Sequence, residues 1–286
     1  MANEQRVRSP ASYEEAPVGD WFNVVLLGIV EGLTEFLPIS STAHLLIVAK
    51  MLGFRNDAGG TFEIFIQSGA ILAVLGFYAR DLLAQARTLP HDAMTRRFWT
   101  GALVAFLPAA LVGMVMRTWI KAVLFGSPMV IAGALIVGGV ILIIIELLPR
   151  RLATTSNLTH VSLRQAFGIG VAQVFALVPG ISRSGASIVG GLLAGLDRAT
   201  ATRFSFYLAI PTLGAATLLD LVSSLDQLVP GDLGRLVLGA LVSLVVAWMS
   251  IGWLLRYVAH NGFVAFGVYR IVVGAVVLAL VALGRL

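Results

Sequence analysis

The chain has no cysteine, and charged residues are scarce. Asp, Glu, Lys and Arg make up 12% of its 286 residues, against about 25% in an average soluble domain. The missing cysteines exclude disulfides, thiol catalysis and Cys-based metal sites. Charge this sparse cannot coat a soluble protein of this size, whereas 58% hydrophobic residues suit a chain whose solvent is a lipid bilayer. A soluble enzyme, a disordered chain and a nucleic-acid-binding domain are therefore excluded.

The basic residues do not indicate a nucleic-acid partner, although the net charge is +5. They lie mostly at the ends of apolar stretches, where anchoring to the inner leaflet explains them. Residues 1–20 are polar, and we expect a short disordered tail there. A single integral membrane domain is expected at 21–286.

Apolar stretches divide this domain into helices. A membrane-spanning helix needs about 20 apolar residues, and six stretches are long enough: 62–80, 98–118, 128–148, 204–222, 235–257 and 263–284. Two further apolar regions are interrupted, residues 21–52 near Pro38 and residues 164–196 near Pro179. Unpaired backbone persists in a membrane only inside protein or at a watery cavity. We predict an all-α polytopic membrane protein with six full spans and two re-entrant helical hairpins.

The two interrupted regions align with each other at an offset of 142 residues. At this offset Gly28-Ile-Val-Glu31 matches Gly170-Val-Ala-Gln173, and Ile39-Ser40-Ser41-Thr42 matches Ile181-Ser182-Arg183-Ser184. We interpret this as an internal duplication, with repeats at about 21–148 and 163–286. Each repeat holds one hairpin and three spans. Because three is odd, the second repeat is inverted, and the hairpins meet near the midplane of the membrane.

Loop charges predict the orientation. One connecting loop carries Arg80, Arg87, Arg96 and Arg97, whereas residues 223–234 contain no Lys or Arg. The positive-inside rule places the arginine-rich loop in the cytoplasm. We therefore expect the first hairpin to open toward the outside.

The first interruption contains a polar cluster. Glu31 and Glu35 share one helix face, and two like charges in a membrane need a guanidinium or a divalent cation, Mg²⁺ or Ca²⁺, between them. His44 falls in the first turn of the next half-helix, where a neutral imidazole is favoured and can act as a base. Three hydroxyls lie between the carboxylates and the imidazole: Ser40, Ser41 and Thr42. One of them caps the half-helix, but so many polar groups within fourteen residues favour a functional cluster.

The second interruption combines glycine, hydroxyls and one arginine. Its residues are Ser182, Arg183, Ser184, Gly185 and Ser187. Backbone N–H groups at a helix start suit an anion, especially phosphate, and a guanidinium can bind phosphate oxygens in bidentate fashion. Alternatively, Arg183 pairs with Glu31 or Glu35. Both hold if a substrate inserts between them.

Other polar residues inside spans leave alternatives open. Glu63 and Gln67 share a face and either line the same cavity or make an inter-helix hydrogen bond. Gln173 matches Glu31 by repeat and faces the site on this interpretation. Arg270 lies deep in the last span and needs a partner that the sequence does not identify.

The segments Glu31–His44 and Pro179–Ser187, together with Phe62-Glu-Ile-Phe-Ile-Gln67, resemble signature segments of the undecaprenyl-pyrophosphate phosphatase (bacitracin-resistance) family. The resemblance covers the chain from about residue 21 to its end. It implies a bacterial inner-membrane enzyme with a site open to the periplasm. Such an enzyme hydrolyses a polyprenyl pyrophosphate lipid to the monophosphate and inorganic phosphate, recycling the carrier for peptidoglycan.

The same resemblance implies residue roles. Glu31 and Glu35 are the acidic pair that holds a divalent cation, Ser41 and His44 are the nucleophile and its base, and Arg183 binds phosphate. The supporting polar contacts are Ser40, Thr42, Gln67, Ser182, Ser184, Gly185 and Ser187. Direct attack by water, activated through Glu35 or His44, is the rival mechanism.

A transporter or flippase of a lipid phosphate or small anion is the competing class, because inverted repeats with broken helices are also typical of carriers. A nucleophile beside an acidic pair favours the enzyme. Glycine-rich helix faces are compatible with a homodimer.

Overall fold

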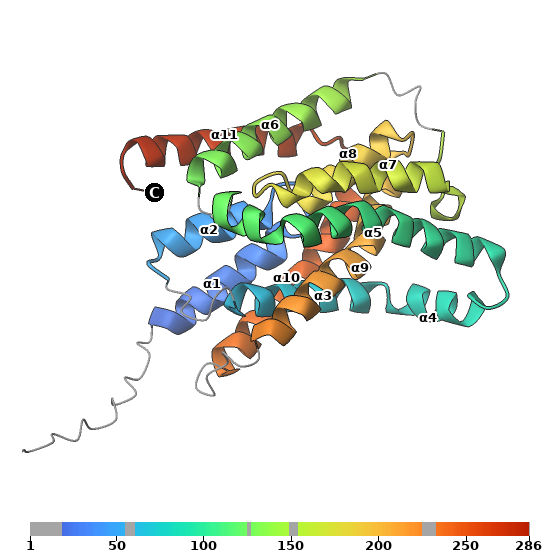
Figure 1. The fold of residues 1–286 in the computed structure, drawn as a ribbon, viewed down its shortest axis with the longest axis horizontal. Coiled ribbons are helices and arrows are strands. Elements are labelled where there is room, and N and C mark those ends of the chain that lie inside the picture. The colour runs from blue at the N-terminus through green and yellow to red at the C-terminus, as the bar shows by residue number, and fades with distance from the viewer. Residues whose placement is uncertain (1–18, 55–60, 125–126, 149–153, 225–232, 286) are drawn as a thin grey trace, which may run out of the picture.

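The computed structural model describes residues 19–54, 61–124, 127–148, 154–224 and 233–285. These ranges form helices, and their one strand-like contact is an isolated bridge between Thr155 and Leu196. The helices are α1 (Gly19–Thr34), α2 (Ser41–Met51), α3 (Thr61–Phe77), α4 (Ala79–Thr88), α5 (Ala93–Trp119), α6 (Pro128–Leu147), α7 (Leu163–Val174), α8 (Arg183–Leu193), α9 (Arg198–Ser224), α10 (Leu233–His260) and α11 (Val264–Ala282), with short turns η1 (Ile120–Leu124), η3 (Leu158–His160) and η4 (Phe175–Leu177) (Figure 1). The all-α prediction is confirmed for these ranges. The predicted tail lies outside them, except that Gly19 and Asp20 begin α1.

Within the described residues, five helices are long and apolar enough to cross a membrane: α5, α6, α9, α10 and α11. They confirm five of the six predicted spans. The span predicted at 62–80 differs, because α3 ends at Phe77 and α4 continues at an angle of 65°. Only the bent pair together is long enough to count as a span. The bend follows from the composition of α4. Its first turn contains Arg80 and Asp81, and none of its residues is buried, so α4 suits the membrane boundary rather than the interior.

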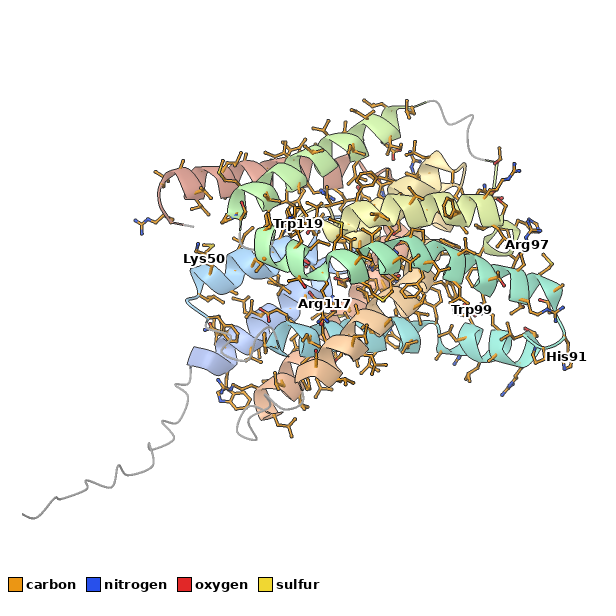
Figure 2. The ribbon with its side chains drawn as sticks, viewed as in Figure 1. Lys50, His91, Arg97, Trp99, Arg117 and Trp119 are labelled. Atoms are coloured by element: carbon orange, nitrogen blue, oxygen red, sulfur yellow. The ribbon has the colours of Figure 1, made fainter. Side chains whose placement is uncertain are left out.

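Apolar side chains cover the outside of the bundle. Val115 is 86% exposed and Leu147 is 74% exposed, and many other large apolar residues on the spans are also exposed. Figure 2 places Lys50 at one end of the long axis and His91 and Arg97 at the opposite end. An apolar belt between charged ends is what a bilayer requires. The chain is a multi-pass membrane protein.

Glycines allow the short helices to approach the long ones closely. α1 packs against α10, and a Cβ atom at Gly28 would lie 2.8 Å from the carbonyl oxygen of Gly239. α7 packs against α5, and a Cβ atom at Gly170 would lie 2.5 Å from the carbonyl oxygen of Ala105. Carbon atoms cannot approach an oxygen this closely, so the two contacts require glycine.

Similar turns connect α1 to α2 and α7 to α8. The first turn is residues 35–42 and the second turn is residues 177–184, each including the start of the helix that follows. α2 and α8 each contain 11 residues. Each follows a serine with a positive φ, 75° at Ser40 and 76° at Ser182, and no other non-glycine residue of the described ranges has one. Each serine caps its helix: Ser40 Oγ accepts a hydrogen bond from the backbone N–H of Ala43, and Ser182 Oγ accepts one from Gly185. The two serines are 142 residues apart, the offset that the sequence alignment predicts.

The two turns meet inside the bundle. The hydroxyl of Ser184, at the start of α8, donates to the carbonyl oxygen of Leu37 at 2.8 Å. The fold thereby brings the two polar clusters of the sequence together.

Candidate active site

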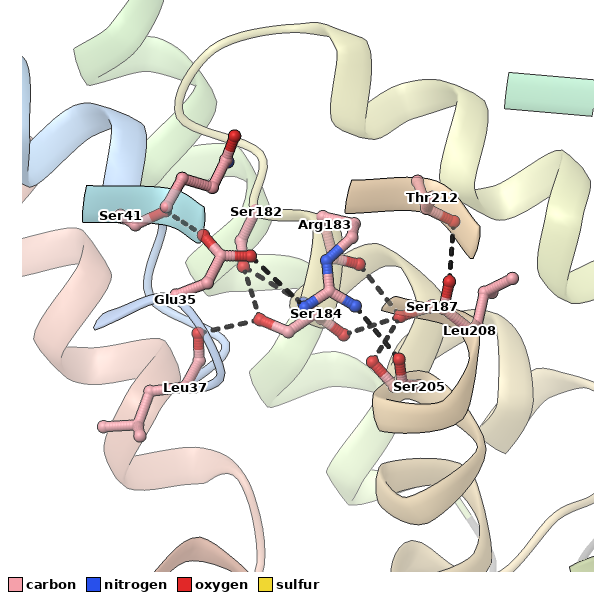
Figure 3. A network of polar contacts seen from close by, with 12 residues as sticks. Glu35, Leu37, Ser41, Ser182, Arg183, Ser184, Ser187, Ser205, Leu208 and Thr212 are labelled. Carbon is pink, nitrogen blue, oxygen red and sulfur yellow. Dashed lines mark hydrogen bonds and ion pairs between the residues drawn. The ribbon is translucent and has the colours of Figure 1, made fainter. Parts of the chain in front are cut away.

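A buried ion pair joins the two turns. Arg183 is the first residue of α8; its Nη2 donates to Oε1 of Glu35 at 3.3 Å, and its Nη1 donates to the carbonyl oxygen of Ser205 at 3.0 Å (Figure 3). The side chains of Glu35 and Arg183 are only 4% and 10% exposed. The guanidinium also lies 5.9 Å from the centre of the Phe36 ring. The predicted pairing of Arg183 with one of the two glutamates is confirmed for Glu35.

Glu35 also binds the hydroxyl of Ser41. Ser41 Oγ donates to Glu35 Oε2 at 2.5 Å (Figure 3). One carboxylate therefore receives a guanidinium on one oxygen and a hydroxyl on the other. A serine within hydrogen-bond reach of a proton acceptor that a third group orients is the arrangement of an activated nucleophile.

Two buried polar atoms beside this pair have no hydrogen-bond partner. Glu31 lies one helical turn before Glu35 and is 1% exposed, and its Oε1 is unpartnered. Nε of Arg183 is buried and unpartnered as well. Unsatisfied groups in the interior are costly. The site thus holds one spare acceptor and one spare donor, which suit a cation and a phosphate oxygen.

The acidic pair can accept a cation only as part of a larger donor set. Among the described residues, no group of three or more His, Cys, Asp or Glu side chains could hold a metal ion. Glu31 and Glu35 offer two carboxylates. Mg²⁺ is usually bound by one or two carboxylates together with substrate phosphates, so these residues fit a cation that is shared with a diphosphate.

The serines of the second turn are mostly engaged within the protein. Ser182 and Ser184 contact each other through their hydroxyls at 3.0 Å, and Ser187 contacts Ser205 at 2.7 Å (Figure 3). Ser187 also donates to the carbonyl oxygen of Arg183 at 2.9 Å. The contact between Ser187 and Ser205 joins α8 to α9, and the other contacts order the start of α8, where Arg183 lies.

The remaining predicted contacts are Gly185, Thr42 and Gln67. Gly185 uses its N–H to bind Ser182 Oγ. Thr42 follows Ser41 and is half-buried in the first turn of α2. Gln67 accepts a hydrogen bond from Thr217 at 3.1 Å, so of its two interpretations the inter-helix bond is the one observed.

His44 is held by groups other than Ser41. Its Nδ1 lies 2.7 Å from the carbonyl oxygen of Ser40, and its Nε2 lies 2.8 Å from the hydroxyl of Tyr269, whose ring stacks on the imidazole. Because a carbonyl only accepts, a neutral imidazole here carries its proton on Nδ1, and its Nε2 accepts from Tyr269. The hydroxyl of Ser41 has Glu35, not His44, as its partner in this arrangement.

The sequence singled out Arg270 but not its partners, and it missed three other neighbours of the site. Arg270 is buried and binds carbonyl oxygens of both turns. The missed neighbours are Phe36, Ser205 and Tyr269. An intramembrane charge was the signal at Arg270, whereas nothing in the pattern around Ser205 or Tyr269 links those residues to the turns.

Comparison with known proteins decides the family. Residues 24–276 match the family described as bacitracin resistance protein BacA. The chain belongs to the BacA family. The match begins in α1 and ends in α11, so it includes both turns and the ion pair between them.

Proteins named undecaprenyl-diphosphatase are similar to nearly the whole chain. The protein of Deinococcus radiodurans is 48% identical over 272 residues, which are 93% of this chain and 97% of that protein. The protein of Deinococcus deserti is 49% identical over 271 residues, with the same coverage. The protein of Caulobacter vibrioides is 43% identical over 266 residues, or 93% of this chain and 99% of that protein. The family predicted from the motifs is confirmed.

Proposed function

We propose that the chain is an undecaprenyl-diphosphatase, which hydrolyses undecaprenyl pyrophosphate to undecaprenyl phosphate and inorganic phosphate. The observation that carries the proposal is the arrangement of Ser41, Glu35 and Arg183, which places a nucleophile, a proton acceptor and a phosphate-binding cation in one hydrogen-bonded chain. Relatives of this name match nearly the whole chain. The reaction recycles the lipid carrier for peptidoglycan and so gives bacitracin resistance, because bacitracin sequesters the pyrophosphate.

Substrate binding reorganises the buried ion pair. Arg183 offers an unpartnered Nε, and its Nη2 is bound to Glu35. The terminal phosphate takes the free Nε and competes with Glu35 Oε1 for Nη2, because a guanidinium binds two phosphate oxygens side by side. Glu35 keeps Ser41 on its other oxygen.

Ser41 then attacks the terminal phosphorus. The proton of its hydroxyl passes to Glu35 Oε2, and the bond between the phosphorus and the bridging oxygen breaks, which releases undecaprenyl phosphate. Water afterwards attacks the phosphoserine, inorganic phosphate leaves, and the proton held by Glu35 returns to the Ser41 oxygen. Such transfers depend mainly on positioning and electrostatics. Direct attack by a water that Glu35 activates is the alternative that uses the same geometry.

A divalent cation, Mg²⁺ or Ca²⁺, fits Glu31 and Glu35 and would neutralise diphosphate charge there. Its binding can be tested separately from the chemistry. Glu31→Gln should raise the cation concentration that gives half-maximal activity. Gln173→Leu, at the position that matches Glu31 by repeat, should leave that concentration unchanged, because the amide of Gln173 binds Thr212 of α9. Equal shifts in both variants would contradict the assignment.

The membrane arrangement that supports this site is an inverted repeat with two re-entrant hairpins. The equal lengths of α2 and α8 and the serines at a 142-residue offset support it. The arginine-rich end around Arg97 favours a cytoplasmic placement (Figure 2), which leaves the first hairpin open to the periplasm in an inner-membrane enzyme. The lipid tail of the substrate stays in the bilayer. A homodimer is a further prediction.

The experiment that tests the function is phosphate release by the purified protein in detergent, with a long-chain prenyl pyrophosphate and with or without EDTA. We expect EDTA-sensitive release that Ser41→Ala removes. Ser68→Ala is the matched control, because Ser68 binds only a carbonyl of its own helix, that of Phe65. Absence of release from folded wild-type protein would contradict the proposal.

A lipid or anion carrier is the second candidate, because two similar short helix pairs that meet inside a bundle are also a transporter architecture. Fluorescently labelled prenyl phosphate in proteoliposomes separates the two functions. Movement of the label between leaflets without any phosphatase activity would favour the carrier. Phosphate release without movement would favour the enzyme.

A further inference from the structure

Arg270 is a buried charge that none of the proposed chemical steps uses. It lies in the apolar helix α11, is 1% exposed, and is the largest fully buried side chain of the described residues. No carboxylate of the described ranges pairs with it; all five of its hydrogen bonds go to backbone carbonyl oxygens. A buried charge persists only when its surroundings compensate it. These contacts are the compensation.

The five carbonyl groups come from three separate segments. Nη1 donates to Pro38 at 3.2 Å and to Ile181 at 2.8 Å, so one nitrogen contacts both turns. Nη2 donates to Gly180 at 2.9 Å and to Ala134 of α6 at 3.2 Å. Nε donates to the carbonyl oxygen of Leu135 in α6 at 3.4 Å. One rigid guanidinium therefore ties both turns to α6.

The contacts lie close to the site on each side. Pro38 comes two residues before Ser40, and Ile181 comes directly before Ser182. The two serines cap the helices that begin with Ser41 and Arg183. A shift of either carbonyl group would therefore move the reacting hydroxyl or the phosphate-binding guanidinium relative to the other.

Two glycines of α6 provide the space that the Arg270 guanidinium and the neighbouring helix α11 occupy. α6 and α11 lie side by side (Figure 1), and a Cβ atom at Gly139 would lie 2.6 Å from the carbonyl oxygen of Gly267. A Cβ atom at Gly138 would lie 2.0 Å from Nη2 of Arg270. A methyl group at residue 138 would therefore displace the guanidinium without changing Arg270 itself.

We propose that Arg270 is a positioning residue of the phosphatase: its guanidinium sets the separation of the two turns and thereby the placement of Ser41 and Glu35 relative to Arg183. The proposal rests on the proposed function of this site. Arg270 touches neither substrate nor reacting atoms and acts only through backbone carbonyl groups. Loss of this tether impairs alignment in the transition state more than binding, since the groups that hold the diphosphate remain.

Kinetics of two different variants test the proposal. Arg270→Lys keeps the charge but cannot reach all three segments from a single nitrogen. Gly138→Ala keeps Arg270 but displaces its head group. We expect both to lower kcat by about 100-fold with KM changed by only a few fold, as misplacement of catalytic groups by about 1 Å can do. Gly133→Ala is the control in the same helix, because a Cβ atom there meets nothing within 4 Å, and its kcat should match wild type.

A double variant distinguishes positioning from general loss of structure. If Arg270 acts through Arg183, Arg183→Ala combined with Arg270→Lys should lose no more than about tenfold beyond Arg183→Ala alone, because the two changes disable one unit. A full additional 100-fold loss would overturn the proposal. So would unchanged kcat in folded Gly138→Ala, or a raised KM with normal kcat.

A distance measurement separates this proposal from the function on which it rests. The chain has no cysteine, so Met51→Cys and Leu193→Cys, at the exposed ends of α2 and α8, can be spin-labelled without background. We expect pulsed EPR to show a broadened or shifted distance in Gly138→Ala and the wild-type distance in Gly133→Ala. If wild-type protein releases no phosphate, the function fails while this measurement still tests the tether. An unchanged distance in Gly138→Ala would overturn it.

Discussion

The turn around Ser40 and the turn around Ser182 share a backbone and differ in chemistry. Both serines adopt the left-handed region and cap a helix of 11 residues. The residue after the cap is a hydroxyl in the first turn, Ser41, and a guanidinium in the second, Arg183. Before the cap, Glu35 supplies a carboxylate in the first turn, whereas the matching position of the second is Leu177.

The difference shows how one backbone feature can serve two roles. The backbone of each turn holds the first residue of a helix inside the bundle, and the side chain at that position decides what it does. Because the turns face each other, Ser41 and Arg183 reach the same carboxylate from opposite sides. A repeated fold with unequal side chains therefore produces a single asymmetric site.

After loss of the Ser41 hydroxyl, the largest expected effect is loss of the guanidinium from the second turn. Arg183→Ala should lower kcat/KM by about 10³-fold or more, the scale on which a phosphate-directed arginine contributes. Steady-state phosphate release measures it. Arg203→Ala is the control, because Arg203 is an exposed arginine of α9 and should retain activity. Similar losses of kcat/KM in Arg183→Ala and Arg203→Ala would contradict a specific role for the guanidinium of the second turn.

Removing the Glu35 carboxylate from the first turn should lower activity nearly as much. Glu35→Gln keeps the shape of the side chain but cannot accept the proton of Ser41, so kcat should fall by about 10² to 10⁴-fold. His44→Ala should lower kcat by much less, because the His44 ring contacts Ser40 and Tyr269 and not Ser41. The reverse order, with His44→Ala the more damaging, would make His44 the base.

The His44–Tyr269 contact belongs to the first turn alone, since Ala186 stands at the matching position of the second. Tyr269→Phe removes one hydrogen bond to the imidazole, and we expect a loss of kcat of about tenfold or less, equivalent to roughly 1.4 kcal/mol. The double variant with His44→Ala should resemble His44→Ala alone. Kinetics of the three proteins measure this, and fully multiplicative losses would mean that the two residues act separately.

Loss of either helix cap should have the smallest effect, and the two cap variants should lose similar amounts of stability. Ser40→Ala and Ser182→Ala lose the cap while keeping the strained φ, so each should destabilise the fold by about 1 kcal/mol. The corresponding glycine variants should lose only a few tenths of a kcal/mol, because glycine accepts a positive φ. Denaturation in detergent measures all four. A large effect at one serine only would show that the turns are not equivalent in backbone.

The sequence predicted those features that interrupt an apolar pattern. Proline and a run of hydroxyls mark each turn against a hydrophobic background. A lone arginine opposite two glutamates predicted an ion pair with Glu31 or Glu35, and the structure shows it with Glu35. The bend after α3 was missed, because the apolar run continues to Tyr78 and the charges of α4 begin only at Arg80.

The unpredicted parts of the site depend on contacts between distant helices. Tyr269 reaches His44 across 225 residues, and Arg270 reaches Pro38 across 232. Gly139 and Gly138 make the second contact possible through the close approach of α6 and α11. A charge in a span indicates that a partner exists, but only helix packing determines which carbonyl groups it meets.

The most direct test of a single site built from two turns is a double-mutant cycle across them. Phosphate release from a long-chain prenyl pyrophosphate is measured for wild type, Ser41→Ala, Arg183→Ala and the double variant. We predict that wild type releases phosphate, that each single variant loses most of the rate, and that the double variant is no slower than the slower single one, because groups that act as a unit are not additive. Multiplicative losses, or full activity in either single variant, would contradict the account.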